Sequence, residues 1–251
     1  MLKAGEAARM TGLVVITRPR DEAAELAAEL DRLGYRTLIE PMLEIASLPA
    51  PIPSLRQYRA LVFTSANGVR AFADRSSERA IPAFAVGART AESLRSAGFA
   101  TVHEAAGDSE VLAAMICSMP GAKGPVLHLS GKAVAGDLGA LLAPAGIPVD
   151  RLALYDAVPV HSLSSVLVAE LYARTIEYVL FFSARTAGTF GTLLRERGLA
   201  NMITSSYALC LSSQVAAQAA TLPWRRVKTA PGPTAEALVG LLPALGSRDA
   251  G

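Results

Sequence analysis

The sequence predicts an α/β protein made of two similar, doubly wound parallel-sheet domains. Short, uninterrupted apolar runs alternate with segments of helical spacing, and a glycine closes many of these segments. Such runs are typical of strands covered on both faces, and strand–helix alternation at this length favours parallel sheets. The chain also repeats its own motifs in the order A, B, A′, B′. This order indicates two copies of one architecture, each with about five strands.

The strands are expected at the apolar runs, and the helices directly after them. The runs lie near residues 14–17, 60–64, 83–86, 126–129, 178–182 and 207–211. The helical segments are Asp21–Leu33, Asn67–Asp74, Thr90–Ala97, Val134–Ala145, Thr186–Arg197 and Gln214–Ala220. Glycines that can end helices in a left-handed conformation are Gly34, Gly98, Gly146 and Gly198. Hydroxyl residues placed to cap helix starts are Ser65, Ser109, Ser183 and Thr234.

The repeat leaves the pairing of the segments open. Segment A contains Val14–Thr17, which recurs in A′ as Val126–Leu129. Segment B contains Ser65 and Gly107–Leu112, which recur in B′ around Ser183 and as Gly232–Leu238. Segment A can fold with B and A′ with B′, in tandem. It can also exchange, A folding with B′ and B with A′. In the exchanged case the only crossings are the proline-containing segments Leu38–Ser54 and Val149–Ser162, which could pair as a two-stranded hinge.

Composition excludes several classes of protein. A chain that is 51% hydrophobic and 18% charged is not intrinsically disordered, and a net charge of +2 is too small for phosphate neutralisation on nucleic acid. Two cysteines fit a reducing compartment, and no apolar run reaches the ~18 residues of a membrane helix. We therefore expect a cytoplasmic monomer without a structural metal, with 1–12 and 246–251 as flexible ends.

Hydroxyls, glycines and single cations follow the predicted strands. Each serine alone is most simply a helix cap, but the set lies at the strand ends where parallel sheets bind ligands. Backbone N–H groups at helix starts favour carboxylates or phosphates. The set therefore predicts an anionic ligand held between the domains. Its members are Thr17, Arg18, Ser65, Gly87, Arg89, Thr90, Ser130, Lys132, Ser183, Ser212 and Ser213.

Several of these motifs, in their order and spacing, resemble the uroporphyrinogen-III synthase family over roughly residues 13–243. They are Val14–Pro19, Phe63–Val69, Ala85–Ala91, Leu154–Tyr155, Phe181–Ser183 and Pro233–Leu238. The resemblance implies the exchanged connectivity, with two α/β domains joined by a two-stranded β ladder. It implies a discontinuous first domain of 13–40 and 158–245 and an inserted second domain of 44–152.

The resemblance also implies a reaction. The family cyclises the linear tetrapyrrole hydroxymethylbilane to uroporphyrinogen III, losing water and inverting the last pyrrole ring through an azafulvene and a spirocyclic pyrrolenine. No metal or organic cofactor is needed. The partner is thus a small molecule with eight carboxylates, which fits scattered hydroxyls, amides and cations better than a catalytic triad.

By the same resemblance, Tyr155 is the expected catalytic residue, donating a proton to the departing hydroxyl. Thr90, Ser65 and Ser183 match positions associated with the cleft, while Arg18, Arg89 and Lys132 are candidate counter-charges. One departure is Ser212–Ala216, where many relatives carry glycine first and threonine at Val215. Ser212, Ser213 and the helix start are expected to substitute. The three histidines are expected to be structural.

Two other readings compete with this one. A two-domain binding or sensory module could close on an anion without chemistry, because fold does not fix function. Such an inert relative would be expected to lose Tyr155 or the Thr90 loop, and both are present. A dinucleotide-dependent enzyme is disfavoured because no Gly-x-Gly-x-x-Gly follows any predicted strand. The sequence therefore favours the enzyme.

Overall fold

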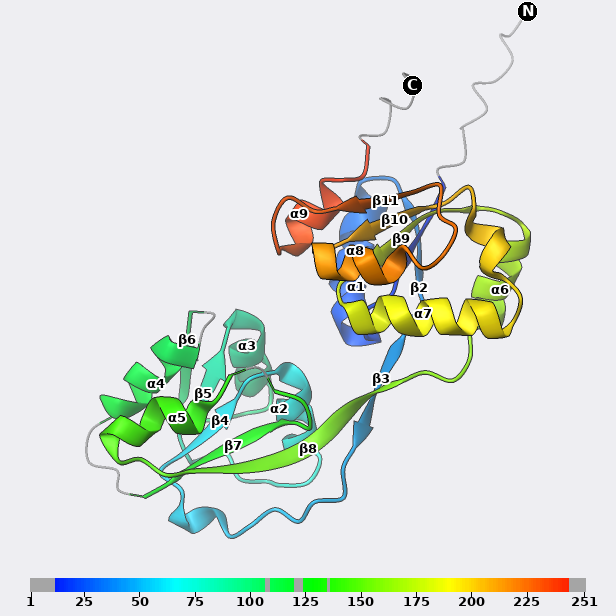
Figure 1. Ribbon diagram of the computed structural model, residues 1–251. Coiled ribbons are helices and arrows are strands. Elements are labelled where there is room, and N and C mark those ends of the chain that lie inside the picture. The colour runs from blue at the N-terminus through cyan, green and yellow to red at the C-terminus, as the bar shows by residue number, and fades with distance from the viewer. Residues whose placement is uncertain (1–11, 107–108, 120–123, 135, 244–251) are drawn as a thin grey trace, which may run out of the picture. The chain divides into compact units, whose positions relative to one another are not determined.

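The computed structural model describes residues 12–106, 109–119, 124–134 and 136–243 (Figure 1). Its contacts divide the chain into two compact units. The first unit contains the described residues of Met1–Glu44 and Pro159–Gly251, and the second unit is Ile45–Val158. The expected flexible ends, 1–12 and 246–251, lie outside the described residues, except for Gly12. Residues 107–108 of the repeat and residues 244–245 of the expected first domain also lie outside them.

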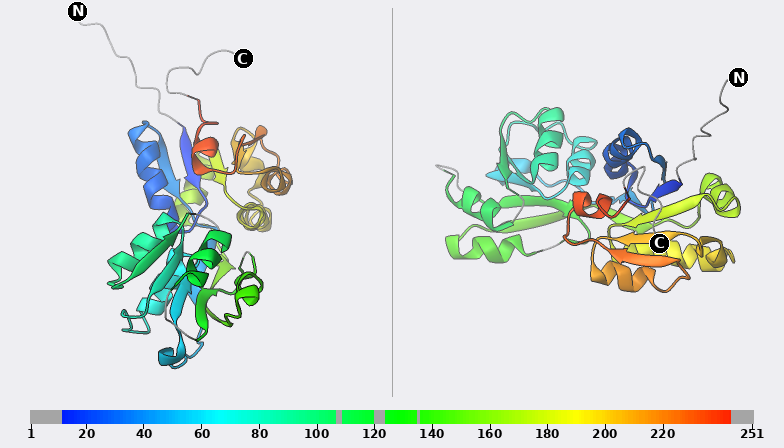
Figure 2. Two further views of the ribbon diagram at one scale, coloured as in Figure 1. Left: turned by 90° about the vertical axis from the view of Figure 1, so that its left-hand side faces the viewer. Right: turned by 90° about the horizontal axis from the view of Figure 1, so that it is seen from above.

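The first unit is a five-stranded sheet in the order β11-β10-β9-β1-β2, with every neighbouring pair parallel. Its strands are β1 (Leu13–Ile16), β2 (Arg36–Ile39), β9 (Ile176–Phe181), β10 (Tyr207–Cys210) and β11 (Arg226–Thr229). Helices cover both faces (Figure 2). One core holds residues of α1 (Arg20–Arg32) and α9 (Ala235–Val239), and the other holds residues of α6 (Ser165–Tyr172), α7 (Ala184–Glu196) and α8 (Ser213–Ala219). A short 3₁₀ turn, Ala200–Ile203, precedes β10.

The second unit repeats this plan with a six-stranded sheet in the order β3-β8-β7-β4-β5-β6. Its strands are β3 (Leu43–Ser47), β4 (Ala60–Phe63), β5 (Ala83–Val86), β6 (Val102–Ala105), β7 (Val126–Gly131) and β8 (Val149–Pro159). One core contains α2 (Ala66–Ala73) and α3 (Ala88–Ser96), and the other contains α4 (Ser109–Cys117) and α5 (Leu138–Leu142). The predicted α/β class with parallel sheets is confirmed.

The strands pair in the exchanged manner. β1 lies between β2 and β9, so the start of the chain shares a sheet with segments more than 150 residues further on. The two segments that cross between the units contain β3 and β8, which are neighbours at one edge of the second sheet. Just beyond β3, the Leu48 N–H donates to the carbonyl of Leu154 at 2.8 Å. Of the two pairings that the repeat allows, tandem and exchanged, the structure has the exchanged one.

One predicted helix is wrong in extent. Val134–Ala145 was expected to be helical throughout, but α5 spans Leu138–Leu142 and a 3₁₀ turn follows at Ala143–Ala145. Two local features limit it. Gly136 has φ +78°, which breaks a right-handed helix, and the Asp137 side chain accepts the Ala140 N–H at 3.1 Å and so caps the helix start there.

The expected helix ends are largely confirmed. Gly34, Gly98, Gly146 and Gly198 all have positive φ, between 66° and 89°. Ser65, Ser183 and Thr234 each accept the N–H three residues ahead, as N-caps do. Ser109 begins α4 directly after residues outside the description, so its capping role is not tested. Within the described residues, no helix combines the length and hydropathy needed to cross a bilayer.

Candidate functional site

In the second unit, a pair of hydroxyl groups lies where the parallel strands end. Ser65 follows β4 and caps α2, with its Oγ accepting the Gly68 N–H at 3.2 Å. The same Oγ lies 2.6 Å from the phenol oxygen of Tyr155, which projects from β8. The structure thus brings together the expected catalytic residue and one expected substrate-binding residue, 90 positions apart in the chain.

The phenol of Tyr155 lies against the backbone of Gly131 at the end of β7. A Cβ atom placed on Gly131 would be 2.9 Å from two ring carbons of Tyr155 and 3.1 Å from its oxygen. The strand register shifts between Ser130 and Gly131, so that Gly131 pairs with Tyr155 and not with Leu154. The Lys132 N–H then donates to the Tyr155 carbonyl at 2.8 Å. A bulge of this kind re-aims a side chain, here the phenol.

Arg151, which is not among the predicted site residues, holds the segment Ser130–Lys132 at the end of β7, called the loop below. Its Nε donates to Ser130 Oγ at 3.0 Å, and its Nη2 donates to the carbonyls of Gly131 at 2.7 Å and Lys132 at 2.6 Å. An arginine four positions before Tyr155, on a strand that is otherwise apolar from Leu152 to Tyr155, was the available signal. Arg151 is exposed, and its planar guanidinium, which carries several N–H donors, finds three acceptors there.

The other expected residues of the second unit differ in what they can offer a ligand. Gly87 caps α3 with φ +80°, and Thr90 lies in the first turn of that helix with a side chain that is 5% exposed. Arg89 is exposed. Ser130 is buried, and its hydroxyl donates to the Gly131 carbonyl. Lys132 is 71% exposed, with its Nζ 3.6 Å from Asp156. A ligand can therefore reach Arg89 and Lys132, whereas Ser130 serves the loop.

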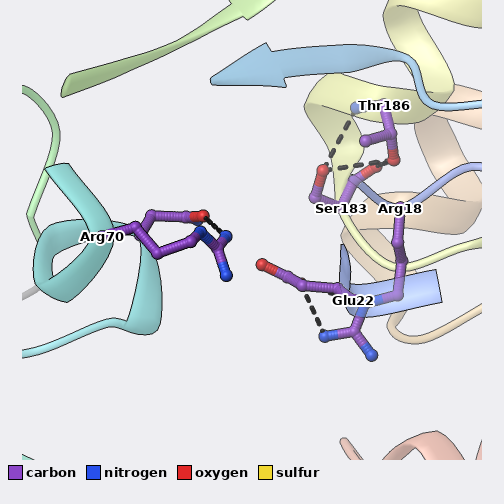
Figure 3. A network of polar contacts seen from close by, with 6 residues as sticks. Arg18, Glu22, Arg70, Ser183 and Thr186 are labelled. Carbon is purple, nitrogen blue, oxygen red and sulfur yellow. Dashed lines mark hydrogen bonds and ion pairs between the residues drawn. The ribbon is translucent and has the colours of Figure 1, made fainter. Parts of the chain in front are cut away.

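In the first unit, several expected residues are engaged within the fold. Thr17 is fully buried, and its hydroxyl donates to the Leu180 carbonyl at 2.7 Å, tying β1 to β9. Ser183 Oγ accepts the Thr186 N–H at 3.1 Å and donates to the Thr186 hydroxyl at 3.2 Å (Figure 3). Ser212 caps α8 through the Val215 N–H at 3.4 Å, and Ser213 is exposed. Thr17 is thus a structural residue of the sheet.

Arg18 is the expected cation of the first unit. Its guanidinium forms an ion pair with Glu22 one helical turn away, at 2.9 Å (Figure 3). The same group lies 4.5 Å from the centre of the Phe182 ring. Both contacts orient a half-buried cation, while Glu22 offsets part of its charge. Arg18 is therefore a weaker anion ligand than an unpaired arginine.

His128 is buried in β7, with its Nε2 3.3 Å from the Thr64 hydroxyl. Burial, and to a smaller extent the nearby positive charge of Arg151, lowers the pKa of this imidazole to about 4. The ring is neutral at ordinary pH. This agrees with the structural role expected for it.

The hydrogen-bond inventory shows what the Ser65–Tyr155 pair can do. Ser65 Oγ has one hydrogen and two lone pairs, and the Gly68 N–H occupies one lone pair. Whichever hydroxyl donates across the 2.6 Å contact, one hydroxyl hydrogen of the pair stays available to a ligand. If Ser65 donates, that hydrogen is the phenol's, which is the more acidic of the two. The pair can thus deliver one proton while stabilising the oxygen that gives it up.

Comparisons with known proteins agree with this architecture. The family model described as uroporphyrinogen-III synthase HemD matches residues 24–240. "Porphyrin biosynthesis protein HemD" of Ruminiclostridium josui is 23% identical over 218 residues, which is 81% of this chain and 42% of that protein. "Uroporphyrinogen-III synthase" of Chlorobaculum parvum is 35% identical over 60 residues, or 24% of each chain. The chain thus spans less than half the length of either curated relative in these matches.

A solved structure shares the fold. The crystal structure of uroporphyrinogen-III synthetase from Helicobacter pylori superposes with a TM-score of 0.60 at 20% identity, covering 92% of this chain and 98% of that one. Identity this low supports a shared fold and no more. Family membership rests on the family model, because its match spans most of both units. The chain belongs to the uroporphyrinogen-III synthase HemD family.

Proposed function

We propose that this protein cyclises hydroxymethylbilane to uroporphyrinogen III, with loss of water and inversion of the terminal pyrrole ring. The observation that carries the proposal is the Tyr155 phenol, seated on Ser65 at the strand ends of a chain that belongs to this family. Neither the family match nor the named relatives support the alternative of a non-catalytic binding module.

Tyr155 acts on the first step in this proposal. The terminal carbon–oxygen bond breaks as the pyrrole nitrogen lone pair replaces it, and the phenol proton leaves with the hydroxyl as water. Ser65, donating to the phenol oxygen, stabilises the negative charge that develops there. The resulting protonated azafulvene closes to the spirocyclic pyrrolenine, which fragments and recloses with the last ring inverted. The α-proton that this ring loses as it regains aromaticity returns to the Tyr155 phenolate. Holding the linear chain in a curled conformation supplies much of the remaining acceleration.

The substrate's carboxylates require several weak contacts in place of one strong site. Cations, hydroxyls and helix starts that follow the strands are suited to this task. The supporting residues are Arg18, Ser65, Gly87, Arg89, Thr90, Lys132, Ser183, Ser212 and Ser213. Thr17 and Ser130 are left out because they are buried and their hydroxyls donate within the fold, whereas Ser183 is partly exposed. Both cysteines are free thiols, which supports a reducing, cytoplasmic compartment. The protein is proposed to act as a monomer.

The test is product analysis with freshly made hydroxymethylbilane and no added cofactor. Uncatalysed closure gives the symmetrical isomer I, so oxidised products are separated by chromatography into isomers I and III. We expect mostly isomer III at catalytic protein concentrations. Isomer I alone, formed at the rate seen without protein, would contradict the proposal and leave a binding module on this fold, with Ser212–Val215 as the first segment to examine.

A further inference from the structure

We propose that Arg151 is a positioning residue that sets the place of the Tyr155 phenol, acting through the backbone of Gly131 and Lys132. This inference rests on the proposed function, in which Tyr155 donates the proton. Arg151 lies outside the set of residues expected to bind substrate. Its contacts are with the loop against which the phenol lies.

Arg151 clamps that loop at three oxygen atoms. One nitrogen, Nη2, bridges two successive carbonyls at 2.7 and 2.6 Å, and Nε reaches the Ser130 hydroxyl at 3.0 Å. Hydrogen bonds from a charged donor are stronger than neutral ones, and the planar guanidinium fixes their directions. Ser130 itself donates to the Gly131 carbonyl at 3.0 Å, so that carbonyl accepts two hydrogen bonds. The loop is therefore fixed by Arg151 just where β7 ends.

The position of the loop sets the position of the phenol. The Tyr155 ring lies on the bare backbone of Gly131, where a single methyl group would come within 2.9 Å of the ring. The Lys132 N–H also anchors the Tyr155 carbonyl. A shift of the Gly131 backbone therefore moves the phenol relative to Ser65, which is itself held by capping α2. Displacements near 1 Å at a reacting group can lower turnover by about a hundred-fold.

A positioning role and a direct contact with substrate predict different kinetics. The Nη1 group of Arg151 could instead bind a substrate carboxylate, and its loss would then raise KM in any background. If Arg151 only positions the phenol, its loss lowers kcat, and it does so only in a protein that still has the Tyr155 hydroxyl. Arg151→Gln removes the charge and the bridge. Arg151→Lys keeps the charge, but an ammonium group cannot reproduce the planar three-point contact.

The first experiment is a double-mutant cycle with Tyr155→Phe, measuring initial rates of isomer III formation. We expect Arg151→Gln and Arg151→Lys each to lower kcat about ten-fold with KM changed less than two-fold. In the Tyr155→Phe background, the same changes are expected to alter kcat less than two-fold. Equal losses in both backgrounds, or a raised KM with kcat unchanged, would overturn the proposal.

Gly131→Ala tests the same contact by displacing the Tyr155 ring directly, with Arg151 unchanged. The glycine has an ordinary φ, so the backbone tolerates alanine and the added methyl group acts on the ring. We expect a ten-fold or larger loss of kcat that again disappears with Tyr155→Phe. Gly232→Ala is the matched control, because its new methyl group would meet nothing nearer than 3.9 Å, and its kcat should stay within two-fold of the parent. An active Gly131→Ala enzyme would contradict the positioning role.

A measurement without substrate keeps this inference separate from the proposed function. Protein labelled with ¹³C at Cζ of its six tyrosines gives a resonance for Tyr155, assigned by its loss in Tyr155→Phe. We expect that resonance to move in Arg151→Gln and in Gly131→Ala, while those of Tyr35, Tyr178 and Tyr207 in the first unit do not. An unmoved Tyr155 resonance overturns the positioning role whatever the activity. A moved resonance in a protein that makes no isomer III supports positioning and rejects the proposed reaction.

Discussion

The serines that cap helices in this protein differ in the hydrogen bond that each hydroxyl makes besides the capping bond. Ser65, Ser183 and Ser212 each accept a backbone N–H three residues ahead. The Ser183 hydroxyl donates a hydrogen bond to Thr186 of its own helix, whereas the Ser65 hydroxyl is hydrogen-bonded to a phenol from another strand. The same local motif thus caps a helix in both copies of the repeat and in the second unit also contacts Tyr155.

Removing the Tyr155 hydroxyl tests that contribution. Tyr155→Phe is expected to lower turnover ten-fold or more, the low end of general-acid effects, with little change in the free energy of unfolding because the ring still packs on Gly131. Steady-state rates of isomer III formation and urea unfolding measure the two quantities. Unchanged turnover would remove Tyr155 from the mechanism.

His128 makes stability depend on pH. Its pKa is about 4 in the folded protein and near 6.5 when unfolded, so between these values the unfolded chain binds the proton and the folded one does not. Stability is therefore full above about pH 6.5 and falls as the pH drops toward 4, by up to about 3 kcal/mol.

Urea unfolding of the parent and His128→Gln at pH 7.5, 6 and 5 checks this effect. The substitution should flatten the loss of stability over that range. His161→Gln, which alters an exposed histidine, is the control and should keep the parent's profile. Parallel profiles for the parent and His128→Gln would show that another group controls the pH dependence.

At the scale of elements, the sequence predicts the buried central strands and misses three of the four edge strands, while β3 and β8 lie in the two extended segments that could pair. β1, β4, β7, β9 and β10 are almost wholly buried, so each reads as an apolar run. β2, β6 and β11 lie at sheet edges and are partly exposed, so their sequences mix apolar and charged residues such as Arg36, Glu104 and Lys228. A partly exposed edge strand lacks the continuous apolar run by which the buried strands are recognised in the sequence.

The helix-ending glycines were predictable because they depend on local backbone conformation. Gly198 follows α7 with φ +66°, and a Cβ there would meet nothing within 4 Å. Gly198→Ala therefore isolates the backbone strain of a left-handed alanine, expected to destabilise the protein by about 1–2 kcal/mol in urea unfolding. Gly232→Ala has ordinary φ and open space, so it should change stability by less than about 0.5 kcal/mol. Equal effects at the two positions would contradict the strain argument.

At the scale of the whole molecule, the first unit is closed by contacts between the segment that leaves it and the one that returns. Glu40, 5% exposed at the end of β2, accepts hydrogen bonds from the N–H and hydroxyl of Ser164 at 2.7 and 2.6 Å. The Val160 N–H donates to the Met42 carbonyl at 3.2 Å. These bonds join chain segments more than 115 residues apart.

Glu40→Ala breaks this connection and leaves two Ser164 donors without the carboxylate. We expect the free energy of unfolding to fall by about 2–3 kcal/mol, because two hydrogen bonds from Ser164 to a carboxylate are lost and alanine offers no acceptor. Hydrogen exchange should rise first in α6, which Ser164 caps. The control is Glu44→Ala, an exposed position on the same segment. A loss no larger than that of the control would show that the connection contributes little.

The candidate site was predictable only in part. Tyr155 and Ser65 could be named because they lie in recognisable motifs, but their 2.6 Å contact depends on a register shift between β7 and β8 that no local pattern encodes. Arg151 was missed because its acceptors, which are the Ser130 hydroxyl and two backbone carbonyls, lie at the end of β7, some 20 residues away in the chain. Conversely, Thr17 matched a motif yet its hydroxyl is used by the sheet.

The exchanged connectivity also orders events during synthesis. The second unit is one uninterrupted stretch, Ile45–Val158, so all of its strands have left the ribosome while the first unit still lacks three of its five. β1 is made first but must wait for β9, some 160 residues later, before its inner neighbour exists. Until β9 is made, the nascent chain therefore carries an apolar β1 that can pair with β2 on one edge only, so we expect translation speed and chaperone access to affect the yield of folded protein.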